Sequence, residues 1–174
     1  MPDTFIKIAS VTVGSGGAAN IEFTSISSAY TDLFLVVSAR FNASLDAGSG
    51  AAFCKMTFNN VTTNYSNRFL TGDGSSAASN NNTNPPNFPC AGTNNTSNTF
   101  GSTSIYIPNY GSSNNKSISI DAINETNATT AYAVLRASLW SNSAVISSIK
   151  LEELATGANF LQYSTATLYG IKNS

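Results

Sequence analysis

The segment AYAVLRASLW, residues 131–140, decides the fold class together with the two segments that follow it, VISSIKLEEL at 145–154 and LQYSTATLYGI at 161–171. Apolar and polar side chains tend to alternate in each segment. This is the period of a β-strand, in which successive side chains point to opposite faces. Short polar breaks such as SNS separate the segments. This part of the chain therefore predicts three consecutive strands.

One face of the first segment is small and apolar, and it carries Ala133, Leu135 and Leu139. The most apolar run of the chain, LFLVVSARF, contains Leu35 and Val37. Such a run is typical of a central strand that is covered on both sides. We expect all of these apolar side chains to be buried between two packed sheets.

Further short segments rich in branched residues, bounded by Gly, Asn and Ser, occur along the rest of the chain. They are 5–13, 20–26, 33–41, 53–58, 65–70, 102–108 and 116–123. Roughly eight to ten short strands without helical periodicity predict an all-β protein, an antiparallel β-sandwich or jelly roll. A chain of 174 residues fits a single domain, residues 1–174.

Two segments are expected to lie at the margin of the sandwich or outside it. Residues 1–13 are expected to form an N-terminal strand or an arm, because the branched run FIKIASVTV ends at the glycines of GSGG. Residues 71–99 are rich in Gly, Ser, Asn and Pro, so we expect one long polar loop outside the sandwich. Loops of this length are usually functional or mobile, and both interpretations stay open.

The surface is expected to be neutral and rich in hydroxyl and amide groups. Only 10% of the residues are charged, eight Lys and Arg against nine Asp and Glu, and neither sign is clustered. A chain without a basic patch is poorly suited to nucleic acid or to an anionic membrane surface. No leader segment and no apolar run near the ~18 residues of a membrane span occur. We therefore expect neither nucleic acid nor a membrane as a partner.

The residues that usually carry chemistry are scarce. Histidine is absent, which removes the usual base for Ser and Cys nucleophiles and the standard zinc sites. Paired carboxylates could still hydrolyse a sugar, but only Asp121 and Glu125 lie near each other in or beside an expected strand. We expect no enzyme, no catalytic residues, no cofactor and no metal site. Cys54 and Cys90 allow a disulfide or two buried thiols, and the lack of an export signal favours the thiols.

Four stretches of the chain, taken in order, resemble small virion structural proteins of tailed bacteriophages, cyanophages among them. They are YTDLFLVVSAR (Tyr30–Arg40), MTFNNVTTNYSNRFLTGDG (Met56–Gly74), SLWSNSAVISSIKL (Ser138–Leu151) and TLYGIK (Thr167–Lys172). The order of these stretches carries the resemblance, and no single motif is specific. The Asn- and Pro-rich insert at 79–98 departs from the pattern.

The resemblance implies a β-sandwich that assembles as a homotrimer. It implies either a capsid cement or decoration protein, which binds the major capsid protein across capsomers, or a tail-fibre or host-receptor domain that binds carbohydrate. The first alternative is favoured because the chain has no fibrous or coiled-coil stem. It would place the protein on the capsid surface of the virion, after synthesis in the host cytoplasm.

Each alternative has its own candidate contacts. The low charge and the apolar start of the chain indicate a surface that is covered on assembly, with Phe5, Ile6 and Ile8 as candidate assembly contacts. A receptor binder would concentrate its affinity in aromatic anchors on the long loop, for which Phe88 and Phe100 are the candidates.

Overall fold

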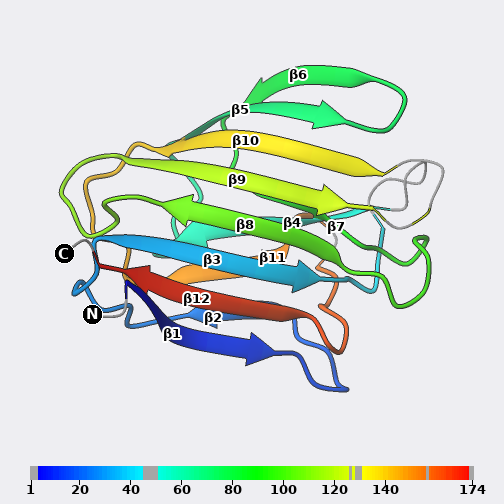
Figure 1. Ribbon diagram of the computed structural model, residues 1–174, viewed down its shortest axis with the longest axis horizontal. Coiled ribbons are helices and arrows are strands. Elements are labelled where there is room, and N and C mark those ends of the chain that lie inside the picture. The colour runs from blue at the N-terminus through cyan, green and yellow to red at the C-terminus, as the bar shows by residue number, and fades with distance from the viewer. Residues whose placement is uncertain (1–3, 45–50, 126, 128–130, 156, 173–174) are drawn as a thin grey trace.

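Two antiparallel sheets pack against each other in the computed structural model of the chain (Figure 1), which describes residues 4–44, 51–125, 127, 131–155 and 157–172. The sheets contain twelve strands, and the described residues contain no helix. The protein is therefore an antiparallel β-sandwich, which confirms the all-β fold class predicted from the sequence.

The larger sheet has eight strands and the smaller sheet has four. The order in the larger sheet is β1 (Phe5–Thr12), β12 (Thr165–Ile171), β3 (Asp32–Ala39), β8 (Gly101–Ile107), β9 (Lys116–Asn124), β10 (Tyr132–Trp140), β5 (Tyr65–Gly72) and β6 (Ala77–Asn82). The order in the smaller sheet is β2 (Asn20–Phe23), β11 (Ile149–Glu153), β4 (Ala52–Phe58) and β7 (Asn87–Cys90).

The faces that the two sheets turn toward each other form the core. Strand β3 contributes Leu33, Leu35 and Val37, and all three side chains are buried. Met56 of β4 and Leu151 of β11, from the smaller sheet, are fully buried as well. The expectation of burial is thus confirmed for Leu35 and Val37.

The expectation for β10 is wrong, because this strand turns its other face inward. Ala133 and Leu135 are exposed, Leu135 to 56%, and Leu139 is only half-buried. Val134 and Trp140, on the opposite face, are buried. The small apolar face of β10 therefore lies on the outside of the larger sheet.

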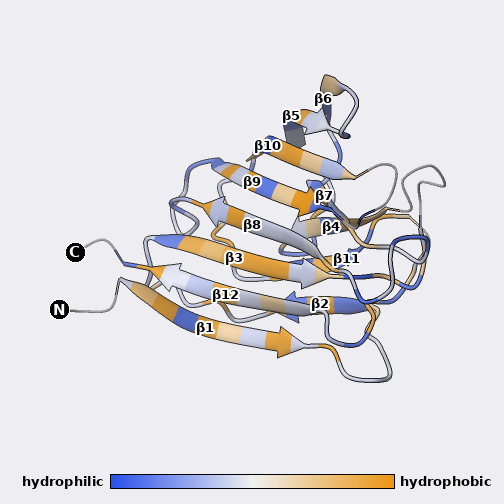
Figure 2. Cartoon of the chain, turned by 45° about the vertical axis from the view of Figure 1, so that its right-hand side comes forward, coloured by the Kyte–Doolittle hydropathy of each residue, from blue (hydrophilic) through white to orange (hydrophobic). Residues whose placement is uncertain are grey.

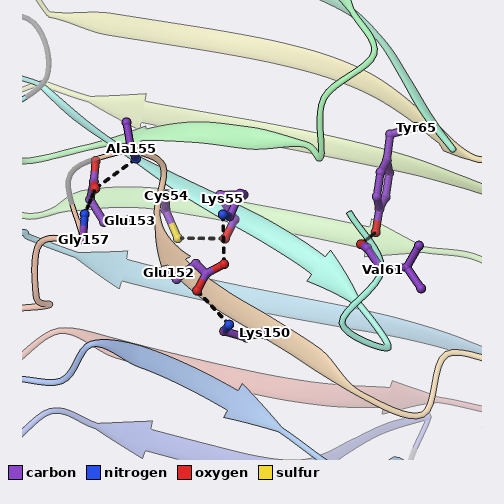
Figure 3. Close-up of polar contacts among 9 residues, drawn as sticks. All are labelled: Cys54, Lys55, Val61, Tyr65, Lys150, Glu152, Glu153, Ala155 and Gly157. Carbon is purple, nitrogen blue, oxygen red and sulfur yellow. Dashed lines mark hydrogen bonds and ion pairs between the residues drawn. The ribbon is translucent and has the colours of Figure 1, made fainter. Parts of the chain in front are cut away.

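The indole of Trp140 explains this orientation. Alternation gives β10 two possible inward faces, and a tryptophan offers more apolar area to the core than a leucine or an alanine. Trp140 is fully buried, with its ring centroid 5.5 Å from that of Phe58 and 6.2 Å from that of Tyr65. The Tyr65 hydroxyl is itself held at the core edge, where it donates a hydrogen bond of 3.1 Å to the carbonyl of Val61 (Figure 3).

The expectation of one unstructured loop over 71–99 is also wrong, because β6 and β7 form there. β6 pairs with β5, and β7 pairs with β4. β7 places Phe88 and Cys90 in the core, where both are fully buried. The strand is too short for alternation to stand out, and its Pro89 lies on an edge strand, where proline is tolerated. With these two strands the total is twelve, above the eight to ten that the sequence predicts.

The start of the chain forms a strand of the larger sheet rather than a free arm. β1 pairs with β12 from Phe5 opposite Ile171 to Thr12 opposite Thr165, with an irregularity between Lys7 and Ala9. In the described part of the chain, β1 and β6 are the two edges of this sheet.

Two of the stretches that carry the resemblance meet at Gly170. The ring of Tyr30 covers this glycine so closely that a Cβ built there would lie 2.3 Å from Tyr30 Cγ. Only glycine fits under the ring, so the close packing of the Tyr-Thr-Asp turn on the last strand requires a glycine at position 170.

Candidate functional site

The outer face of the smaller sheet is charged. Glu152 of β11 forms ion pairs with Lys55 of β4, at 2.9 Å, and with Lys150, at 2.8 Å (Figure 3). Partial burial opposes ionisation of Glu152, but the hydrogen bonds from Lys150 and Lys55 hold its pKa below the ordinary value. Pairs of this kind at a surface contribute about 0–1 kcal/mol each. This face is thus well suited to contact with water.

The outer face of the larger sheet is mostly uncharged and contains an aliphatic patch. We define the aliphatic patch as Leu70, Ala77, Ile123, Ala133 and Leu135, which lie on β5, β6, β9 and β10. Leu135 is paired with Leu70, and Ala133 with Ile123. The exposed fractions of Leu70, Ile123 and Leu135 are 57%, 49% and 56%. Figure 2 shows hydrophobic colour along β10 and at the end of β9.

A hollow in this face gives the aliphatic patch a shape that a neighbour can fill. Its volume is about 560 Å³, and its lining includes Leu70, Gly72, Ala77, Ala133 and Leu135, with the charged Asp121 opposite Leu135. Gly72 lies between Ala133 and Ala77 in the register of the three strands. Because glycine has no side chain, it leaves the hollow open between the flanking strands.

An aromatic row lies at the other side of the same face. We define the aromatic row as Phe5, Tyr169, Phe34 and Tyr106. Phe34 of β3 is directly opposite Tyr169 of β12 and Tyr106 of β8. The ring of Phe5 packs edge-on against Phe34, at 5.9 Å, and against Tyr169, at 6.3 Å. The row presents aromatic surface beside the open edge of β1.

One end of the aromatic row is fixed by a hydrogen bond. The hydroxyl of Tyr106 donates to Oδ2 of Asp32 at 2.8 Å. This hydrogen bond, with smaller effects of burial and of the negative charge of Asp32, raises the pKa of Tyr106. The other oxygen of Asp32 accepts from the backbone N–H of Asn109 at 2.8 Å. The ring of Tyr106 is therefore held in place while 38% of the residue is exposed.

The candidate assembly contacts near the N-terminus are placed unequally. Phe5 is 55% exposed and belongs to the aromatic row. Ile6 and Ile8 are half-buried, and Ile8 packs against the core. Phe5 thus offers the largest apolar surface of the three.

The candidate loop contacts do not form a pair of surface anchors. Phe88 is fully buried in β7 and has no surface to offer a receptor. Phe100 is half-buried and lies in a separate hollow of about 360 Å³ whose lining includes Arg40 and Phe160. The interpretation of Phe88 as an exposed anchor is corrected, because the segment that carries it is a core strand.

The remaining residues of chemical interest are dispersed or inert. Cys54 and Cys90 are free and buried, and burial together with the neighbouring Cys90 raises the pKa of the Cys54 thiol. Asp121 and Glu125 are both exposed. Over the described ranges, no group of three or more His, Cys, Asp or Glu side chains is placed to hold a metal ion. The described residues contain no helix that is long and apolar enough to cross a membrane.

The aliphatic patch was missed in the sequence because β10 was assigned the wrong inward face. A usable signal was present, since Trp140 lies on the same face as Val134 and Arg136. A large aromatic ring at one end of an alternating strand favours burial of its own face. With that choice, Leu135 and Ala133 become surface residues.

Comparisons of the chain with protein-family models, with curated proteins and with solved structures found no match. The resemblance to virion structural proteins thus rests on the order of the four stretches alone.

Proposed function

We propose that the protein is a virion structural protein, a trimeric capsid cement or decoration protein that binds the major capsid protein of a tailed bacteriophage. The observation that carries the proposal is the aliphatic patch on the mostly uncharged outer face of the larger sheet. The resemblance of the four stretches supplies the class of partner. A protein of this kind needs no chemistry, because it works by burying its surface against neighbours.

The aliphatic patch holds apolar area whose burial would favour assembly. Fully burying a Leu or Ile side chain contributes about 1.5–3 kcal/mol. Leu70, Ile123 and Leu135 are each about half exposed, so a substantial part of that free energy remains available to a contact. The charged face of the smaller sheet has no comparable gain, because covering it would remove water from its ion pairs.

The two apolar regions of the larger sheet suggest two different contacts. The aliphatic patch is assigned to the contact within the trimer, because its exposed Leu and Ile side chains gain free energy when a neighbouring copy covers them. The aromatic row, beside the open edge of β1, is assigned to the capsid protein. An unpaired edge offers a row of N–H and C=O groups to a partner.

The experiment that tests the function is a reconstruction of the phage particle. Many copies at symmetry-related positions on the shell are expected for a cement protein, because each trimer fills a gap between capsomers. A few copies at a single vertex would contradict the proposal and indicate a tail protein.

Variants of the two regions separate the two contacts. Phe5→Asp is expected to release the protein from capsids and to leave the trimer intact, whereas Leu135→Asp is expected to break the trimer. Val145→Asp is the matched control, because Val145 is 39% exposed and lies outside both regions. If all three variants are released from capsids to the same extent, the assignment of the two regions to two different contacts is contradicted.

A further inference from the structure

A pocket between the two sheets is separate from the surfaces described above. Its volume is about 310 Å³, which lies at the lower end of the usual range for small-molecule sites. Most of its lining residues come from β4 and β7 of the smaller sheet and from β5, β6 and β10 of the larger sheet. Figures 1 and 2 show that β5 and β6 extend beyond the edge of the smaller sheet. Its walls include Phe53 and Pro89 from the smaller sheet and Phe69, Tyr132 and Arg136 from the larger sheet. We call it the Arg136 pocket.

The guanidinium of Arg136 is the one charged group in the lining of this pocket. Arg136 is only 4% exposed, and its Nη2 donates to Oδ1 of Asn87 at 3.2 Å. Nε carries one N–H and Nη1 two, and neither atom has a hydrogen-bond partner. The ion pairs of the described residues involve Lys55, Lys150 and Glu152, so none of them neutralises Arg136.

A buried cation in this condition is unusual. Burial of a charge is costly unless the charge is paired and hydrogen-bonded. Burial alone lowers the pKa of Arg136 to about 10, so the group is still charged at neutral pH. The Phe69 ring covers one face of the guanidinium at 4.0 Å from its centroid. Hydrogen bonds to a guanidinium form in its plane, so an anion would accept there from the buried Nε or Nη1, which have no partner.

The lining limits the kind of anion. Arg136 supplies one positive charge, and no lysine lines the pocket, so a single negative charge is matched better than a phosphate dianion. The rings of Phe53 and Tyr132 lie 6.1 Å apart in the wall and offer flat apolar contact to a ring-shaped ligand. A carboxylate suits the planar donors of arginine.

We propose that the Arg136 pocket binds a small carboxylate whose body is a ring, either an acidic sugar unit or an aromatic acid. The carboxylate accepts hydrogen bonds from Nε or Nη1 of Arg136, and the ring lies against the aromatic wall. This site is independent of the proposed assembly, because the aliphatic patch and the aromatic row lie on the outer face of the sheet.

The test is a titration of the full-length protein with two pairs of probes at constant ionic strength. Benzoate is compared with benzamide, and glucuronate with glucose, by calorimetry and by NMR. At least one acid is expected to bind with a stoichiometry of one per chain and at least tenfold more tightly than its neutral partner. The pair that shows the preference tells an aromatic acid from an acidic sugar.

A matched pair of variants ties the preference to the pocket. Arg136→Met is expected to remove the tenfold preference for the acid, whereas Arg68→Met, at an exposed arginine of β5, is expected to keep it. If Arg136→Met does not fold, the Nε–H resonance of Arg136 in the unaltered protein provides the readout, and the acid is expected to shift it. Inorganic phosphate is titrated as a further probe and is expected to bind more weakly than the acid. Equal binding of acid and neutral probe, tighter binding of phosphate, or an unmoved Nε–H resonance would overturn the proposal.

Discussion

Leu35 and Leu135 are the same residue type in two strands of one sheet, and their surroundings are opposite. Leu35 is fully buried and Leu135 is 56% exposed. Leu35→Ala is expected to lower the free energy of unfolding by about 2–5 kcal/mol, because it leaves a cavity in the core. Leu135→Ala is expected to cost less than about 1 kcal/mol in the isolated chain. Urea denaturation of both variants at low protein concentration measures the difference, and equal costs would contradict the orientation of β10.

Gly170 is a second residue whose substitution has a predictable effect on stability. Alanine in a strand is normally better than glycine by about 0.5–1 kcal/mol, but a Cβ at position 170 would collide with the ring of Tyr30. Gly170→Ala is therefore expected to destabilise the fold by about 1–3 kcal/mol, as overpacking does. The same substitution in a Tyr30→Ala background is the control, and there most of the loss is expected to disappear. An equal loss in both backgrounds would exclude the ring as the cause.

The hairpin of β5 and β6 depends on one carboxylate in its turn. Asp73 Oδ1 accepts from the backbone N–H of Ser75, at 2.9 Å, and of Ser76, at 2.6 Å. These hydrogen bonds, led by that from Ser75, lower the pKa of Asp73 to about 2. Because the folded-state pKa lies below the unfolded one, the stabilisation is present above pH ~4 and is lost as the pH falls toward 2.

A pH titration of the hairpin by NMR checks this directly. The carboxyl carbon of Asp73 is expected to titrate with a midpoint near 2, and the amides of Ser75 and Ser76 should shift with it. A midpoint near 4 for Asp73 would mean that the turn is not held by its side chain.

Strand positions were predictable from the sequence where the alternation is long, and strand orientation was not. The run that contains Leu35 is apolar enough to be central in any arrangement, so its burial followed from composition. β10 alternates equally well in either orientation, and the choice was settled by packing of Trp140 on Phe58 and Tyr65. Such tertiary contacts join residues far apart in the chain, so alternation within one segment does not reveal them. The size of the Trp140 side chain was the signal within the segment that indicated the inward face.

The short strands and the pocket were beyond sequence reasoning for a related reason. β6 is made of AASNNN and β7 of NFPC, and neither has the branched residues or the alternation that mark a strand. Both form because β5 and β4 offer them open edges. The Arg136 pocket depends on β7 and on the inward face of β10, so no single segment of the sequence could indicate it.

At the scale of the whole molecule, the sandwich has one charged and one mostly uncharged outer face. The Lys55–Glu152–Lys150 ion pairs keep the smaller sheet in water, while the larger sheet exposes the aliphatic patch and the aromatic row. Soluble monomers rarely expose contiguous apolar patches of more than a few hundred Å². The larger sheet is therefore the side to which we assign the proposed assembly.

If the aliphatic patch joins copies of the chain, as we propose, the molar mass in solution shows it most directly. Size-exclusion chromatography with light scattering at micromolar concentration is expected to give three times the chain mass of 18.2 kDa. Leu135→Asp should reduce this to the mass of one chain, and Val145→Asp should leave it unchanged. A single-chain mass for the unaltered protein, or a trimer that survives Leu135→Asp, would contradict the claim.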